Sequence, residues 1–338
     1  MNWNHLANEV LAGRVIDRAQ AMEILSTDPD ELLNVLHGAF LLRKAHFGRR
    51  VRIHVLQNAK SGACPEDCTF CNQSAHFKTP AARYPMQSVN ALVKGAEEAI
   101  TKGARTYCMV TATRGPSEQD IGIVCEAVRQ IKARYSLHIC TSLGLLQPGQ
   151  AERLKAAGVD RYNHNLESSA RYFPETCTTH KYGDRVDTVR MAKDAGMEAC
   201  CGGIIGLGED QLDRVDLALA LRELEVESVP VNLLDPRPGT PLGDNPQLSP
   251  TDALLTLAMF RFVLPNRDLR IAGGREMVLG SMQPLALYTA NSMFTDGYLT
   301  TGGQSPSGDE KMILDAGFEL EPAAVTTSLS ETERAVVS

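Results

Sequence analysis

Three closely spaced cysteines form the group with the clearest chemical meaning in this sequence. Cys64, Cys68 and Cys71 follow the spacing C-x3-C-x2-C, and no fourth cysteine lies nearby. A cubane [4Fe–4S] cluster contains four irons and usually takes four thiolates. Three thiolates therefore leave one iron open to a ligand that is not protein, which predicts iron–sulfur chemistry on a bound molecule.

A structural zinc site is the alternative for this loop. His76 would then be the fourth ligand of a Cys3His set. Zinc sites of this kind favour two paired C-x2-C arms, and this sequence has one. We therefore favour the iron–sulfur cluster.

Further cysteines fall on other predicted strands. Disulfides are disfavoured in the reducing cytoplasm. Cysteines of a cytoplasmic protein are therefore more often buried, catalytic or metal-binding. Cys108, Cys140 and Cys200 lie on three different predicted strands and converge if each points inward. A two-iron cluster needs four ligands. Arg270 is an unusual candidate for the fourth, but from the residues alone an ion pair at the barrel mouth is the favoured explanation of its charge. The alternative for the three thiols is ordinary burial in the core.

The segment 161–167 carries an unusual row of polar side chains. Period-two alternation places Asn163, Asn165 and Glu167 on one face of a strand. These groups are costly in a dry core but can bind a polar ligand in a cavity, and Asn232 on a later strand can join them. A buried polar network with trapped water is the alternative.

A glycine-rich segment, with Gly206 and Gly208, closes the fifth predicted strand. Glycine allows the backbone to approach a ligand closely. The pattern is not G-x-G-x-x-G between a strand and a helix, so a nicotinamide site is not favoured.

Composition limits the classes of partner. The chain has 338 residues, 43% of them hydrophobic, which predicts a sizeable core. The net charge of −7 and the absence of a basic run argue against nucleic acid and anionic membranes. The N-terminus has no signal-peptide pattern, and no uncharged apolar stretch approaches 20 residues. We therefore predict a cytoplasmic protein.

The order of elements predicts an α/β fold, a (β/α)8 TIM-type barrel with an N-terminal helical extension. A doubly wound open sheet is the alternative. We expect the helical extension over residues 1–48, the barrel over 49–320 and a disordered tail over 321–338. Strands are predicted at 51–57, 106–112, 138–143, 161–167, 198–205, 229–234, 269–273 and 292–295. Helices are predicted at 88–102, 117–134, 148–157, 184–195, 210–224, 250–262, 276–290 and 307–316.

Together these motifs resemble the biotin synthases, a family of radical S-adenosylmethionine (SAM) enzymes. The resemblance runs from about Leu42 to Gly317. It rests on the three-cysteine loop and on the segments 162–167, 201–209 and 239–242. The loop alone marks only the radical SAM superfamily, and its combination with the other segments is more specific.

The resemblance implies two clusters. Cys64, Cys68 and Cys71 would be the catalytic ligands of a [4Fe–4S] cluster that binds SAM and cleaves it to methionine and a 5′-deoxyadenosyl radical. A [2Fe–2S] cluster, taken as the sulfur donor, would be held by Cys108, Cys140, Cys200 and Arg270. The substrate would be dethiobiotin, converted to biotin by sulfur insertion in the last step of biotin biosynthesis.

Other roles also follow from the resemblance. Asn163, Asn165 and Asn232 would bind the ureido ring of the substrate, and Thr300 and Thr301 its carboxylate. The SAM site would include Glu167, Asn165, Gly206 and Gly208. The family often has aspartate in place of Glu167. An electron-donor protein of flavodoxin or ferredoxin type and a homodimer are further expectations.

Three remaining cysteines have simpler interpretations. Cys201 directly follows Cys200 and is an alternative thiolate, but strand alternation lets only one of the two point inward. Cys177 is expected in a loop without a role, and Cys125 in the core under a helix.

Two other functions stay open at this stage. One is another radical SAM barrel enzyme, of hydrogenase maturase or methylornithine synthase type. Such an enzyme would keep the Cys64 loop, but it would have less need of a second group of ligands formed by Cys108, Cys140, Cys200 and Arg270. The other is a non-enzymatic zinc or redox-sensing module.

Overall fold

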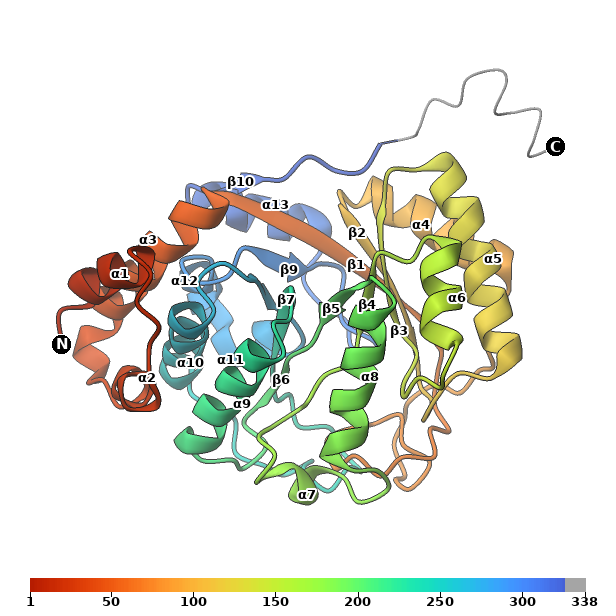
Figure 1. Ribbon diagram of the computed structural model, residues 1–338, viewed down its shortest axis with the longest axis horizontal. Helices are drawn as coiled ribbons and strands as arrows, with labels where there is room; N and C mark the ends of the chain where they lie inside the picture. The colour runs from red at the N-terminus through yellow and green to blue at the C-terminus, as the bar shows by residue number, and fades with distance from the viewer. Residues whose placement is uncertain (326–338) are drawn as a thin grey trace.

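The computed structural model describes residues 1–325, and its centre is a closed parallel barrel (Figure 1). The strands pair in chain order, and β1 also pairs with β9, which closes the barrel. The barrel has eight strand positions. The short strands β5 and β6 both pair with β7 and together occupy one of these positions. This confirms the predicted (β/α)8 fold and excludes the open doubly wound sheet. The strands are β1 (Arg50–Lys60), β2 (Thr106–Thr111), β3 (His138–Ser142), β4 (Arg161–Asn163), β5 (Glu198–Cys200), β6 (Gly203–Ile205), β7 (Ser228–Leu233), β8 (Asp268–Ile271), β9 (Ser292–Phe294) and β10 (Glu319–Leu320).

Helices surround the strands on the outside of the barrel (Figure 1). Several begin at a serine or aspartate whose side chain accepts a backbone N–H of the first turn, as Ser88, Ser117, Asp210 and Ser249 do. The helices after β1 are α4 (Val89–Thr101), α5 (Glu118–Arg134), α6 (Gln150–Ala157), α7 (Phe173–Thr176), α8 (Tyr182–Asp194), α9 (Gln211–Glu223), α10 (Pro250–Val263), α11 (Arg275–Leu279), η2 (Gly280–Met282), α12 (Gln283–Ala286) and α13 (Pro306–Asp315).

Three predicted elements are shorter or broken in the structure. The strand expected at 161–167 ends at Asn163, and the strand expected at 198–205 is interrupted at residues 201–202. At this interruption a Cβ on Gly202 would lie 1.8 Å from the Pro230 carbonyl oxygen, so the two backbones come closer than a side chain permits. The helix expected at 276–290 is divided, because Gly280 adopts a φ of +49° and Pro284 has no N–H to donate.

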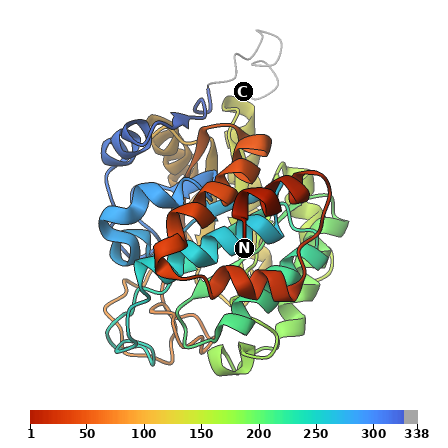
Figure 2. The same ribbon diagram turned by 90° about the vertical axis from the view of Figure 1, so that its left-hand side faces the viewer.

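The N-terminal extension contains α1 (Trp3–Leu11), α2 (Arg18–Leu25), η1 (Pro29–Glu31) and α3 (Leu32–Phe47). It packs against α9 and α10 on the outside of the barrel (Figure 2). Asp28 caps η1, whereas α3 begins without a side-chain cap. The buried faces of these helices carry apolar side chains such as Leu6, Val10, Val35 and Leu36.

The start of the expected disordered tail packs back on the barrel, contrary to that prediction. The Arg52 guanidinium donates to the Glu321 carboxylate at 2.9 and 3.1 Å. The backbone N–H of Ala324 donates to the carbonyl of Ala104, and the Ala324 side chain is buried. The remainder of the predicted tail, 326–338, lies outside the described residues.

Among residues 1–325, every helix is too short or too polar to cross a bilayer.

A buried ion pair fixes α13 to the barrel. The Arg275 Nη2 group donates to both carboxylate oxygens of Asp309, at 2.7 and 2.9 Å, and the Thr295 hydroxyl donates to the same carboxylate at 2.6 Å. Both charged side chains are at most 2% exposed. Removal of one partner would leave the other buried with its charge poorly compensated.

We expect Asp309→Ala to lower the free energy of unfolding by about 3 kcal/mol, because a buried guanidinium loses its main partner. Lys311→Ala is the control, since Lys311 makes an exposed pair with Asp315 on the same helix and should cost less than about 0.5 kcal/mol. Urea-induced unfolding measures both. Equal losses for the two variants would contradict a stabilising role of the buried pair.

Candidate active site

The carboxyl ends of the barrel strands surround a cavity of about 300 Å³. In a barrel of this kind, residues from many strands gather at that end. Its lining comes from the loop after β1, from the ends of β2 to β4, and from β7 to β9 and the segment that follows. A cavity of this volume is within the range that binds small molecules.

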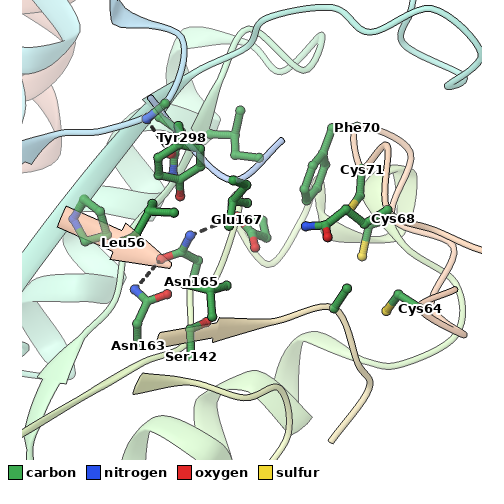
Figure 3. A pocket seen from close by; sticks show the side chains of 18 of the residues that line it. Leu56, Cys64, Cys68, Phe70, Cys71, Ser142, Asn163, Asn165, Glu167 and Tyr298 are labelled. Carbon is green, nitrogen blue, oxygen red and sulfur yellow. Dashed lines mark hydrogen bonds between the residues drawn. The ribbon is translucent and has the colours of Figure 1, made fainter. Parts of the chain in front are cut away.

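The three-cysteine loop lies on one side of this cavity (Figure 3). The loop leaves the end of β1 and folds back on itself, because the Cys64 N–H donates to the Gln73 carbonyl at 3.0 Å and the Cys71 N–H to the Cys68 carbonyl at 2.9 Å. Cys64, Cys68 and Cys71 are all free thiols. The sequence prediction that these three residues share one loop at the barrel mouth therefore agrees with the geometry.

The protonation of these thiols suits a site that is completed by a metal. Burial raises the pKa of Cys64, and it raises that of Cys71 to about 11. The neighbouring Cys177, together with burial, raises the pKa of Cys68 well above its ordinary value. Metal binding to such thiols releases their protons and relieves the cost of their burial. Three free thiols on one side of a cavity fit a [4Fe–4S] cluster that has one iron without a thiolate.

The described residues do not bring His76 and the three cysteines together as a Cys3His set. His76 is exposed, and its Nε2 lies 3.0 Å from the Pro65 carbonyl oxygen.

Arg185 connects the loop to the end of β4. Its Nη1 donates to the Asn165 carbonyl at 2.8 Å and to the Glu167 carboxylate at 3.2 Å, and its Nη2 lies 3.9 Å from Cys68 Sγ. Sequence reasoning missed this residue. A signal was available, because Arg185 occupies the buried face of α8 beside Thr188 and Val189, where an arginine needs a partner.

His180 holds the Arg185 side chain through a hydrogen bond. Its Nε2 accepts from Arg185 Nε at 2.9 Å, and its Nδ1 donates to the Glu66 carboxylate, which fixes the tautomer. Cys177 lies 3.2 Å from the same ring and packs against Cys68. Cys177, expected to have no role, is thus buried beside the three-cysteine loop.

The polar row at the end of β4 forms a chain of hydrogen bonds (Figure 3). Asn163 Nδ2 donates to Asn165 Oδ1 at 3.3 Å, and Asn165 Nδ2 donates to Glu167 Oε2 at 3.4 Å. All three line the cavity, as period-two alternation predicted, although β4 ends at Asn163 and Glu167 has a left-handed φ of +67°. Burial raises the pKa of Glu167, and Arg185 opposes this.

Asn232 also lines the cavity, from β7. It is held at both ends of its amide, since Nδ2 donates to the Gly203 carbonyl at 3.2 Å and Oδ1 accepts from the Gly273 N–H at 2.9 Å. Thr300 and Thr301 line the same cavity, and the Asn72 amide donates to the Thr300 hydroxyl at 2.8 Å.

Gly206 and Gly208 are a correction to the predicted site. Neither lines the cavity. The Gly206 N–H donates to the Glu209 carboxylate at 2.9 and 3.1 Å, and Gly208 is packed against the Tyr172 hydroxyl. These glycines allow a tight local turn rather than contact with a ligand in the cavity.

A second group of thiols lies deeper in the barrel. Cys108 and Cys140 are paired in register on β2 and β3, and they form one buried cluster with Cys200 of β5 and with Phe294. Cys201 instead belongs to the core between the barrel and its helices. Of the two neighbouring cysteines, Cys200 therefore faces the interior. Cys125 is buried in α5, as predicted.

Arg270 lies beside this second group, in the barrel interior and not at the mouth. Its Nη1 is 3.7 Å from Cys200 Sγ, and its Nη2 donates to the Ser228 hydroxyl at 2.7 Å and approaches Asp268 at 3.5 Å. Its Nε has no hydrogen-bond partner among the described residues. The predicted ion pair exists, but its carboxylate is Asp268 below the thiols.

The charges around the second group suit an anionic cluster. Burial raises the pKa of Cys200, while the guanidinium groups of Arg270 and Arg161 oppose this. Burial also acts against the charge of Asp268, yet the same two arginines hold the pKa of Asp268 well below its ordinary value. Asp268 pairs with both arginines, and Arg161 also pairs with the Glu198 carboxylate at 2.6 Å. Three free thiols, the Arg270 guanidinium 3.7 Å from Cys200 Sγ and its unpartnered Nε–H fit a second iron–sulfur cluster.

Two family models match this chain. The Radical SAM superfamily matches residues 59–221, and the Biotin and Thiamin Synthesis associated domain matches residues 230–319. Biotin synthase from Salinibacter ruber is 61% identical over 94% of this chain and 88% of that protein. Biotin synthase from Bacillus subtilis (strain 168) is 47% identical over 94% of this chain and 95% of that protein.

Solved structures share the fold at low sequence identity. Methylornithine synthase superposes with a TM-score of 0.82 at 18% identity and covers 94% of this chain and 97% of its own. A maturase of the [FeFe]-hydrogenase superposes with a TM-score of 0.81 at 13% identity and covers 99% of this chain and 77% of its own. At these identities the likeness shows the barrel fold alone, whereas the sequence relatives show more. Identity of 61% across 94% of its residues places the chain in the biotin synthase family of radical SAM enzymes.

Proposed function

We infer that the chain catalyses the reaction of its family, the radical SAM-dependent insertion of sulfur into dethiobiotin to form biotin, the last step of biotin biosynthesis. One observation carries this inference beyond family membership. Two separate groups of three free thiols lie in one barrel, the first at its mouth and the second deeper inside. A single-cluster enzyme has no use for the second group.

We assign Cys64, Cys68 and Cys71 to the [4Fe–4S] cluster that radical SAM enzymes use. When bound, this cluster and SAM supply an electron and a carbon radical able to take hydrogen from an unactivated C–H bond. The chain itself leaves one coordination position without a thiolate and surrounds it with a cavity. Cysteine 177, although adjacent, is engaged with His180 and Asp67.

Arg185 and Glu167 are placed to bind SAM. A guanidinium forms strong paired hydrogen bonds with a carboxylate, and Arg185 lies at the edge of the cysteine loop, 3.9 Å from Cys68 Sγ. Glu167 can accept hydrogen bonds from ribose hydroxyls. His180 and Glu66 hold the arginine in this position through the contacts described above.

The asparagines suit the ureido ring of dethiobiotin. An amide side chain both donates and accepts, as a cyclic urea does, so Asn163, Asn165 and Asn232 can pair with its N–H and carbonyl groups. Thr300 and Thr301, farther along the same cavity lining, offer hydroxyl groups to the carboxylate of the substrate. Walls such as Leu56 and Tyr298 exclude water from the reacting carbons.

We propose that Cys108, Cys140, Cys200 and Arg270 hold a [2Fe–2S] cluster whose sulfide is consumed as the sulfur substrate. The electrostatic fit of Arg270 and Arg161 supports this assignment. A reductant is also needed, and we propose a protein of flavodoxin or ferredoxin type. We further propose that the enzyme works in the cytoplasm as a homodimer, without nucleic-acid or membrane partners.

Anaerobic incubation of the reconstituted protein with SAM, dithionite or a reduced flavodoxin, and dethiobiotin tests the function. We expect a product heavier by one sulfur and lighter by two hydrogens in the mass spectrum. Iron analysis should give roughly six irons per chain, the sum of a four-iron and a two-iron cluster. About four irons and no sulfur-containing product would favour another radical SAM enzyme.

Cys68→Ala should abolish SAM cleavage, because the [4Fe–4S] cluster loses one of its three thiolates. The release of 5′-deoxyadenosine, measured by chromatography, reports this step without requiring dethiobiotin. Cys125→Ala is the matched control, since Cys125 is a buried thiol remote from both groups. Cleavage at the normal rate in Cys68→Ala would refute the assignment.

Asn165→Ala should weaken dethiobiotin binding roughly tenfold, the effect of about one lost hydrogen bond. The visible spectrum of both clusters should stay unchanged, because the asparagine contacts neither thiol group. Asn245→Ala serves as control, since Asn245 bonds to the Gly206 carbonyl outside the cavity. Loss of a cluster from Asn165→Ala would show a structural role instead.

A further inference from the structure

His54 is a buried histidine that the proposed reaction does not use. It lies on β1, is 0% exposed, and neither ring nitrogen has a hydrogen-bond partner among residues 1–325. Buried polar groups are nearly always hydrogen-bonded, so a fully buried imidazole with two free nitrogens needs an explanation. A missing ligand is one, because a group that binds at this place can supply the partner.

The position of His54 is beside the second thiol group. Strand alternation places His54 on the same face as Leu56, which lines the cavity and packs with the Cys108 cluster. The His54 ring stands edge-on to Phe294 with 5.7 Å between centroids, and the Arg270 guanidinium lies 5.2 Å from the same Phe294 ring. Phe294 belongs to the cluster formed by Cys108, Cys140 and Cys200.

Other free donors gather at the same place. Thr106 pairs with His54 in the strand register, two residues before Cys108, and its buried hydroxyl also has no partner in the described part of the chain. Arg270 Nε is likewise free there. Three unpartnered polar groups around three thiols indicate that the site is built for an occupant that accepts hydrogen bonds.

Among residues 1–325, no acceptor lies within hydrogen-bond distance of either His54 ring nitrogen. The one buried carboxylate of this region, Asp268, already accepts five hydrogen bonds. Its donors are Arg161, Ser228, Arg270, Asn291 and Ser292. Burial, followed by the charge of Arg270, holds the pKa of His54 well below its ordinary value, so the imidazole is neutral and carries one N–H.

We propose that His54 donates its ring N–H to a sulfur atom of the [2Fe–2S] cluster held by the second thiol group. This inference rests on the proposed function, because it takes the second cluster as present. His54 is a positioning and tuning residue, not a ligand. Hydrogen bonds to cluster sulfurs raise the reduction potential, since they stabilise the more negative reduced state. His54 therefore sets how readily this cluster is reduced, and so how readily its sulfide is given up.

The test compares the full-length, anaerobically reconstituted protein with His54→Leu and His54→Asn. Leucine removes the N–H, whereas asparagine keeps a donor at the same place. Optical redox titration measures the potential of the second cluster, and resonance Raman spectra in H2O and D2O report N–H···S bonds through the shift of the Fe–S stretching bands. His37→Leu is the control, because His37 lies on α3 of the N-terminal extension, outside the barrel, where its Nδ1 contacts the Asn4 amide oxygen at 2.8 Å.

We expect His54→Leu to lower the potential of the second cluster and to lose the D2O shift, and His54→Asn to recover much of both. His37→Leu should match the wild type. If His54→Leu assembles only the first cluster, recovery of the second cluster and its D2O shift in His54→Asn supports the proposal. An unchanged potential and D2O shift in His54→Leu would overturn it, as would loss of the second cluster from both His54 variants. A wild-type protein without any second cluster would contradict the proposed site itself.

Discussion

Closure of the barrel by the pairing of β1 with β9 is the constraint on which the rest of the structure depends. It places Phe294 beside His54, and it brings β1, which is followed by the cysteine loop, into contact with β9. Because all the strands are parallel, their carboxyl ends meet at one mouth. Without closure, the three deeper cysteines on β2, β3 and β5 would line an open sheet and could not surround a shared interior.

The barrel interior contains buried charged side chains, and pairing between them offsets the unfavourable free energy of their burial. Buried charges are unfavourable unless they are paired and hydrogen-bonded. Asp268 accepts hydrogen bonds from two arginines and three further donors at once, and one of these arginines, Arg270, lies 3.7 Å from Cys200 Sγ. The same arrangement recurs at the mouth, where Arg185 meets Glu167 beside the other thiol group. In both places a guanidinium held by a carboxylate lies next to cysteines that can carry negative charge.

Sequence reasoning missed several important residues because they act through contacts between distant segments. Glu66, His180 and Arg185 form one chain of contacts, but they come from the loop after β1 and from the start of α8. His54 looks like an ordinary strand residue until both of its ring nitrogens prove to be without partners. Pattern analysis identifies spacing within one segment, and it does not show which buried side chain lacks a partner.

The sequence by itself determined the alternation of strands and helices, the three-cysteine loop and the face on which Asn163, Asn165 and Glu167 lie, whereas the closure of the barrel was decided by the pairing of β1 with β9. These features depend on local spacing and on strand and helix periodicity, which the chain carries in each segment. Only the tertiary structure decided between Cys200 and Cys201, placed Arg270 in the interior and excluded Gly206 and Gly208 from the cavity. Those outcomes depend on where strands break and which backbones approach closely, as at Gly202 and Pro230. Such approaches arise from packing between segments that are far apart in the chain, so no local pattern records them.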